Sequence, residues 1–228
     1  MISLTLKKGK EEPLRRFHPW IFSGAVASAD DQPEDGDLVT IRNCRDEALA
    51  IAHFQNGSIM ARVVSFDPES DPTEPIFWEK KFENALAARR ALGLLADEKR
   101  TDCFRLIHAE GDGLPGLIVD IYGKTAVVQC HSIGMWRQNT LIAKALCSVF
   151  GKKIDAVFDK SAESLPPNFA KTVKNGYLIS PKKEPSAAAV VVENGHKFEV
   201  DWVGGQKTGF FLDQRDNRSL LADFVKKK

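Results

Sequence analysis

The apolar positions in the first third of the chain form short runs separated by turn residues. Residues 38–41, 48–54 and 59–64 have strand-like patterns, and Asn56-Gly57 is typical of a tight hairpin turn. Short strands joined by turns predict a small β-barrel or half-barrel over about the first 65 residues. Residues 66–75 then hold three prolines and four acidic residues, a composition that predicts a linker.

Two stretches in the middle of the chain repeat apolar residues every three to four positions, which is the period of an amphipathic helix. They run from about Phe77 to Leu95 and from Trp136 to Phe150. Strand patterns occupy residues 103–108, 117–122, 125–130 and 154–158. This order of helices and strands predicts a separate α+β domain. Residues 160–186 contain four prolines and are expected to be irregular.

The C-terminal stretch begins with a hairpin pattern and ends with a helical one. Residues 189–192 and 197–203 flank Asn194-Gly195, a strong signal for a two-residue turn. A helix is expected from near Asp216 into the C-terminal lysines, because positive charge suits the negative end of a helix dipole.

Charge and hydropathy narrow the class of protein. The 228 residues carry 32 Lys+Arg and 31 Asp+Glu, so the chain is not a bulk polycation. The charge is uneven, because residues 1–20 carry five basic and two acidic groups, whereas residues 21–40 carry five acidic groups and no basic one. No apolar run approaches the roughly 18 residues of a membrane span, and no signal-peptide pattern opens the chain. We therefore expect a cytoplasmic protein that does not associate with membranes.

The cysteines give no sign of a reactive centre. Cys44, Cys103, Cys130 and Cys147 lack the close Cys-x-x-Cys spacing of zinc and redox sites, so we expect reduced, mostly buried thiols. No other residues have the spacing of metal ligands or of paired catalytic groups. The sequence therefore predicts no metal and no catalytic residue.

The segment around His18 combines two arginines with aromatic residues and is the first candidate site. Arginine contacts phosphates in a bidentate manner, and aromatic side chains stack on unpaired bases. We therefore assign Arg15 and Arg16 to an RNA-facing surface. Trp20 and Phe22 are better explained as core residues of the barrel, and His18 fits either interpretation.

A glycine-rich segment from Glu110 to Gly116 is the second candidate. Its three glycines permit positive φ angles or a close approach of backbone. A phosphate-binding P-loop is excluded, because no Lys-Ser/Thr follows and no helix begins there. We interpret this segment as a structural turn.

The third candidate runs from Gly204 to Arg218 and is dense in polar groups. Asp216 or Asn217 would suffice as an ordinary helix cap, and the segment holds more polar groups than a cap requires. Gly205 and Gly209 let the backbone bend close to another group. We therefore expect this segment to face a ligand, with hydrogen-bonding groups near the start of the helix.

Three motifs, in the same order along the chain, resemble those of the PUA-containing, RlmI-like large-subunit rRNA methyltransferases. They are H-P-W-x-F-x-G over His18 to Gly24, E-G-D-G-L-P-G-L-I-V-D over Glu110 to Asp120, and G-Q-K-T-G-F-F-L-D-Q-R-D-N-R over Gly205 to Arg218. Members of that family use S-adenosylmethionine, and several methylate carbon-5 of cytosine. The resemblance covers essentially the whole chain.

The resemblance implies an α+β layout of three parts. Residues 1–70 would be a PUA-like RNA-binding barrel, residues 76–186 a central α+β domain, and residues 187–228 the first hairpin and helix of a Rossmann-like methyltransferase domain. It also implies S-adenosylmethionine as cofactor and RNA, specifically 23S rRNA, as partner. The residues implied at the cofactor pocket or target nucleotide are Lys207, Thr208, Asp213, Gln214 and Arg215. Those implied at the RNA face are Arg15, Arg16 and His18.

The chain also departs from the family pattern. The family's glycine-rich cofactor turn and catalytic cysteine do not occur in these 228 residues, and none of the four cysteines matches the catalytic one. We therefore expect an N-terminal piece of an RNA methyltransferase that does not transfer methyl groups alone. Its last segment should self-associate, for example as a homodimer, or be disordered, with Phe210 and Phe211 exposed. The alternative is a stand-alone RNA-binding or assembly module.

Overall fold

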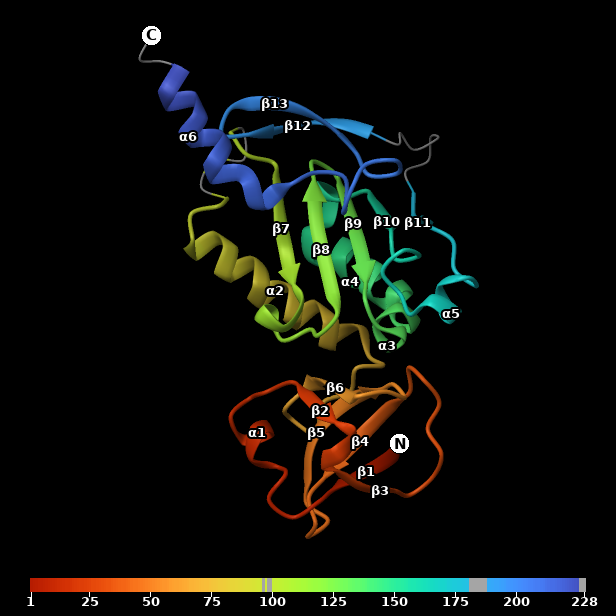
Figure 1. Ribbon diagram of the computed structural model, residues 1–228. Coiled ribbons are helices and arrows are strands. Elements are labelled where there is room, and N and C mark those ends of the chain that lie inside the picture. Colours follow the sequence, from red (N-terminus) through yellow and green to blue (C-terminus); the bar gives the residue numbers. More distant parts are fainter. Residues whose placement is uncertain (96, 98–99, 181–187, 226–228) are drawn as a thin grey trace.

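The N-terminal region is a curled six-stranded sheet with the order β2-β6-β5-β4-β1-β3. The computed structural model describes residues 1–95, 97, 100–180 and 188–225 (Figure 1). The strands are β1 (Ile2–Leu6), β2 (Trp20–Phe22), β3 (Val26–Ala29), β4 (Leu38–Arg42), β5 (Ala48–Phe54) and β6 (Ile59–Ser65), with a short helix α1 (Glu12–Arg15). Strands β4 to β6 confirm the sequence prediction. Strand β1 pairs in parallel with β4 and in antiparallel fashion with β3, which extends the sheet into a half-barrel.

The central domain is a five-stranded sheet with the order β11-β10-β9-β8-β7. Its strands are β7 (Cys103–His108), β8 (Leu117–Tyr122), β9 (Thr125–Cys130), β10 (Ala156–Asp159) and β11 (Gly176–Ile179). Helices α2 (Pro75–Ala91) and α4 (Asn139–Phe150) cover one face (Figure 1), with α3 (Ile133–Arg137) and α5 (Pro167–Ala170) beside them. Trp78, Phe82 and Leu117 are fully buried between helices and sheet, so the α+β fold class is confirmed.

Three details of the central domain differ from the sequence prediction. Helix α2 begins at Pro75 and ends at Ala91, because Gly93 follows with a positive φ of 74°. The helix expected over residues 136–150 is two helices, α3 and α4, which are separated at Gln138. The stretch expected to be irregular contains α5 and β11, and residues 181–187 within it lie outside the described residues.

The C-terminal segment packs on the face of the central sheet that α2 and α4 leave open. It consists of the hairpin β12 (Ala188–Glu193) and β13 (His196–Asp201) and the helix α6 (Arg215–Val225). Val191, Val200 and Trp202 are buried in one cluster with Tyr122 of β8, whose ring stacks on Trp202 at 6.5 Å. The hairpin is therefore a covered layer, because the central sheet offers a second apolar face, and the expectation of exposure applies only to what this face does not cover.

The two phenylalanines of this segment differ in exposure. Phe210 is half-buried, with its ring 5.2 Å from that of Phe198, whereas Phe211 is 40% exposed. Large apolar side chains on α6 are exposed as well, namely Leu220, Leu221, Phe224 and Val225. Self-association through this surface stays a prediction.

The barrel and the central domain touch through polar and close-packed contacts. Trp20 Nε1 donates to Glu110 Oε1 at 2.9 Å, and Arg137 Nη1 donates to Asp37 Oδ1 at 2.7 Å. A Cβ on Gly134 would lie 2.3 Å from Cγ of His53, so only glycine fits there. The proline-rich linker is anchored too, because Trp78 Nε1 donates to the carbonyl of Pro72 at 2.9 Å. No helix in the described part of the chain is long and apolar enough to cross a membrane.

Candidate functional site

The second and third sequence motifs meet at a buried carboxylate. Asp120, at the end of the second motif, is fully buried on β8 and accepts from Thr208 Oγ1 of the third motif at 2.5 Å. Thr208 in turn accepts a hydrogen bond of 2.8 Å from the Tyr122 hydroxyl. Burial raises the pKa of Tyr122, so this hydroxyl keeps its proton. The contact joins positions 88 residues apart in the sequence.

Arg105 of β7 neutralises the buried carboxylate. Its Nε and Nη2 donate to the two Asp120 oxygens, each at 2.8 Å, which is the bidentate geometry that makes arginine–carboxylate pairs strong. The hydrogen bond to Asp120 raises the pKa of Arg105. The two residues face each other in the β7–β8 register. Arg105, Asp120, Thr208 and Tyr122 therefore form one network, which we call the loop anchor.

The glycines of the third motif pack against its own hairpin. A Cβ on Gly205 would lie 2.2 Å from the carbonyl oxygen of Asp201, and one on Gly209 would lie 2.8 Å from the same atom. Gly209 also has a φ of +126°, which L-residues with side chains rarely adopt. Lys160, which is almost fully buried, donates its ammonium to the carbonyl of Gly205. The backbone thus bends close to strand β13.

A groove of about 840 Å³ lies between the second and third motifs. Gly111 and Asp112 line it from the second motif, and Asp213, Arg215 and Asp216 line it from the third. The rest of its wall comes from α2 and β7, including Arg89, Cys103, Phe104, Arg105 and His108. Asp112 is fixed by bidentate bonds of 2.5 and 2.6 Å from Arg89, so the glycine-rich turn has the structural role expected of it. We take this motif groove as the candidate ligand site.

The five predicted cofactor residues divide into three groups. Asp213 and Arg215 line the motif groove. Lys207 and Gln214 are exposed outside it; Lys207 Nζ lies 3.2 Å from Asp213 Oδ2, and this hydrogen bond lowers the pKa of Asp213. Thr208 is fully buried in the loop anchor. Sequence reasoning missed Arg105 and Asp120, although opposite charges within two neighbouring apolar strands are a usable signal.

The barrel presents the predicted RNA-facing residues on its surface. Arg15, Arg16 and His18 are exposed. Phe22 is 49% exposed, so its assignment to the core is wrong, because β2 is an edge strand on which Ile21 turns inward and its neighbours outward. Trp20 is half-buried at the contact with the central domain and lies outside the barrel core.

Aromatic rings cluster around His18. The centroid of its ring lies 5.9 Å from that of Trp20 and 6.4 Å from that of Phe22. Phe17, one residue earlier, is 72% exposed and has a φ of +59°. The ring edges and the neighbouring arginines form an exposed surface, which we call the aromatic-arginine face, comprising Arg15, Arg16, Phe17, His18 and Phe22.

The cysteines and acidic residues provide little further chemistry. Burial raises the pKa of Cys103 to about 12 and also raises the pKa of Cys130, so both remain thiols. Cys147 is half-buried and Cys44 is exposed, so the expectation of mostly buried thiols holds fully for two of the four. Among the described residues, no three His, Cys, Asp or Glu side chains are placed to hold a metal ion.

Comparisons with known proteins show what this chain is similar to. Residues 4–66 match a family model described as a PUA-like domain. Ribosomal RNA large subunit methyltransferase I of Pseudoalteromonas translucida is 36% identical over 98% of this chain and 54% of its own length. The protein of that name from Aliivibrio fischeri is 36% identical over 100% of this chain and 56% of its own.

A solved structure supports the fold independently. The structure of SMU.776, described as a methyltransferase complexed with SAH, matches 97% of this chain and 53% of its own with a TM-score of 0.75 at 22% identity. This chain spans about half the length of the curated relatives it matches. The resemblance carried by the three motifs is therefore confirmed, and the chain matches RlmI-like, PUA-containing large-subunit rRNA methyltransferases along its whole length.

Proposed function

We propose that this chain is the RNA-binding and central portion of an S-adenosylmethionine-dependent methyltransferase that acts on large-subunit rRNA. The observation that carries the proposal is the hydrogen bond from Thr208 to Asp120, which joins the two most specific motifs around one groove. Similarity along this whole chain to about half the length of rRNA methyltransferases supports it. A cytoplasmic location follows from an rRNA substrate and stays a prediction.

The motif groove fits the amino acid end of S-adenosylmethionine. Asp213 and Arg215 carry opposite charges on its wall, and they match the ammonium and carboxylate groups of a zwitterion. When bound, this cofactor supplies a methyl group activated by a sulfonium. The loop anchor would keep the Gly205–Arg218 loop in place, so Thr208 acts by positioning and does not touch the cofactor.

Methylation of cytosine carbon-5 is the finer part of the proposal. That carbon is a weak nucleophile, so the reaction needs a thiolate that adds to the ring. The raised pKa values of Cys103 and Cys130 keep these groups protonated, and Cys44 and Cys147 do not line the motif groove, so none of the four fills that role. We therefore expect RNA and cofactor binding by these 228 residues without methyl transfer. Incorporation of labelled methyl into 23S rRNA by the chain alone would contradict this.

Charge reversal on the aromatic-arginine face tests the RNA-binding part. We expect Arg15→Glu/Arg16→Glu to weaken binding to 23S rRNA at least tenfold and to reduce the slope of log K against log salt by about 2. Lys144→Glu/Lys171→Glu changes the net charge equally at exposed positions of the central domain and serves as the matched control. Equal affinity of the two double variants would exclude this face as the RNA site.

Calorimetric titration with S-adenosylhomocysteine tests the cofactor part. Arg215→Ala removes a groove cation that, unlike Arg89 and Arg105, is not held by a carboxylate in the described part of the chain, and it should weaken binding at least tenfold, because one charged hydrogen bond contributes about 1.5–3 kcal/mol. Arg45→Ala, at an exposed position of the barrel, is the control. If Arg215→Ala binds as tightly as the unchanged chain, the cofactor does not contact this wall.

A further inference from the structure

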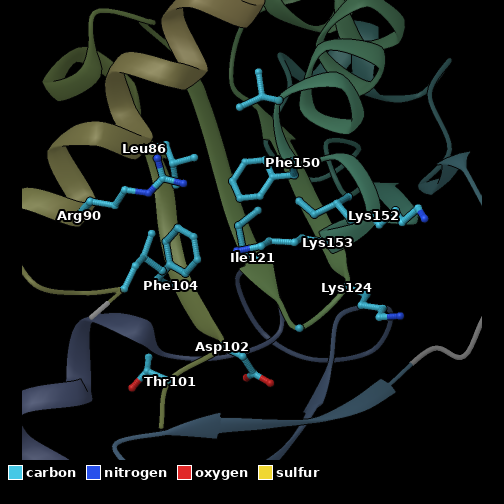
Figure 2. Close-up of a pocket in the computed structure, with 14 residues that line it drawn as sticks. Leu86, Arg90, Thr101, Asp102, Phe104, Ile121, Lys124, Phe150, Lys152 and Lys153 are labelled. Carbon is cyan, nitrogen blue, oxygen red and sulfur yellow. The ribbon is translucent and has the colours of Figure 1, made fainter. Parts of the chain in front are cut away.

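A second cavity lies on the helix-covered side of the central sheet, near the C-terminal ends of α2 and α4. Its volume is about 410 Å³, within the range of about 300–1,000 Å³ typical of small-ligand sites. Leu86, Phe104, Ile121 and Phe150 converge around it (Figure 2). Leu86, Phe104 and Ile121 are buried and Phe150 is half-buried, so the floor is apolar and partly aromatic.

The rim of this cavity is basic. Arg90 stands on one side, and Lys124, Lys152 and Lys153 stand on the other (Figure 2). In the part of the chain that the structure describes, Lys124 and Lys152 are exposed and form no ion pair. Asp102 is the one carboxylate among the described lining residues, and its Oδ1 accepts from Val192 N at 2.7 Å. The rim therefore favours a ligand with a negative charge.

An aromatic floor below a ring of cations suits a nucleotide. A base can stack on an aromatic face irrespective of its identity, and phosphate pairs with lysine and arginine. Thr101 Oγ1 already accepts from Asn194 N and Asp102 Oδ1 from Val192 N, so the acceptor that the wall offers to the amino group of a base is Asp102 Oδ2. A simple aliphatic anion would use the charge and the apolar floor but would not use this acceptor.

We propose that this cavity binds one nucleotide of an RNA strand, with the base against Phe104 and Phe150 and a phosphate at Lys124 and Lys152. The RNA source rests on the proposed function. Phe104 lines both this cavity and the motif groove, and the neighbouring residues Arg89 and Arg90 line one each. An RNA strand whose target nucleotide enters the motif groove thus finds this cavity next to the groove, where it can place another nucleotide.

The test compares charge reversals that have equal net charge. The probe is a single-stranded oligoribonucleotide of about 12 nucleotides, a length within the usual footprint of such sites. We expect Lys124→Glu/Lys152→Glu to weaken its binding about tenfold and to lower the salt slope by about 2. Lys144→Glu/Lys171→Glu, outside the cavity, should change the affinity less than twofold. Identical affinities of the two variants would overturn the proposal.

A crosslinking arm locates the base without altering the fold. RNA containing 4-thiouridine should, on irradiation, label peptides that contain Phe104 or Phe150, and an excess of cold oligonucleotide should suppress the labelling. Phe150→Ala should weaken binding about tenfold, provided that its melting temperature shows a folded protein. Labelling confined to the barrel would count against the cavity.

Two further outcomes separate this inference from the proposed function. Free CMP is tested as the alternative occupant. If the cavity binds CMP but the Lys124→Glu/Lys152→Glu variant binds the oligonucleotide as tightly as the unchanged chain, the cavity is not an RNA site. If Arg15→Glu/Arg16→Glu abolishes RNA binding while the cavity variant binds normally, the cavity proposal fails and the proposed function stands. If the unchanged chain binds no RNA, both fail.

Discussion

The barrel and the C-terminal segment use the same kinds of side chain in opposite ways. On the barrel, Arg15 and Arg16 are exposed and form no ion pair within the described part of the chain, and Phe22 of β2 is 49% exposed. In the C-terminal segment, Arg218 holds the buried Glu193 through bonds of 2.7 and 2.8 Å and lies 4.3 Å from the centre of the Phe210 ring.

This difference shows that a high density of polar and aromatic residues does not by itself mark a ligand site. The third motif looked like ligand-binding machinery, and much of it instead holds the hairpin and loop to the sheet through buried pairs. The barrel motif looked partly like core, and its side chains are available to a partner. Whether each charge already has a partner is what separates the two regions.

The largest expected effect comes from the paired region. Asp120→Ala leaves Arg105 half-buried without its carboxylate and removes the acceptor of the Thr208 hydroxyl, whereas the bond from Tyr122 to Thr208 can persist. Removal of one partner from a buried ion pair typically costs about 3–5 kcal/mol. We expect the free energy of unfolding in urea to fall by this amount.

Its matched control is an ion pair on the barrel surface. Asp46 lies 3.4 Å from Arg42, its side chain is 85% exposed and its φ is +65°, so Asp46→Asn, which removes the charge and tolerates this φ, should change the free energy of unfolding by less than about 1 kcal/mol. If both substitutions lower the free energy of unfolding equally, the loop anchor stabilises the protein no more than a surface ion pair does. The contrast between the barrel and the C-terminal segment would then disappear.

A smaller, pH-dependent effect is expected at the joint between barrel and central domain. Burial, together with the positive charge of Arg62, lowers the pKa of His53 to about 4. Below about pH 6.5, the ordinary pKa of histidine, His53 therefore binds a proton in the unfolded chain but stays neutral in the folded chain. The contribution of His53 to stability is intact above about pH 6.5 and falls by about 3 kcal/mol as the pH drops to 4.

Urea unfolding at several pH values checks this expectation. His53→Met places an apolar side chain against Gly134 that cannot bind a proton. The stability of this variant should therefore fall less steeply below pH 6.5 than that of the unchanged chain. Carboxylates titrate in both proteins and cancel in the comparison. Parallel curves for the two proteins would show that His53 is accessible to protons in the folded state.

Local sequence patterns predicted most of the fold. Strands β4 to β9 and the hairpin β12–β13 lie where alternation and turn residues place them, because these elements are specified by near neighbours. Strands β1 and β3 escaped prediction because their pairing in the sheet depends on distant segments: β1 pairs in parallel with β4. Gln138 between α3 and α4 has no sequence signal of its own, and the break there went unnoticed.

The site was less predictable because its geometry is set by long-range contacts. The family resemblance pointed to Asp213 and Arg215, which line the motif groove, but it could not tell that Thr208 points into the fold toward Asp120. Phe22 was assigned to the core because it is large and apolar. Its exposure follows from the place of β2 at the sheet edge, which no local pattern reveals.

The smallest effect on stability is expected from Phe22, the half-exposed aromatic side chain at the edge of the barrel sheet. Phe22→Ser removes a ring that is 49% exposed, so the free energy of unfolding should change by less than about 0.5 kcal/mol. If the ring stacks on an RNA base, the same substitution should weaken RNA binding by about 1 kcal/mol, roughly fivefold. Leu221→Ser, on a 64% exposed side chain of α6, is the control and should leave RNA binding unchanged. A loss of stability at Phe22 without a loss of affinity would place the ring in a structural role and remove the contrast between the two regions.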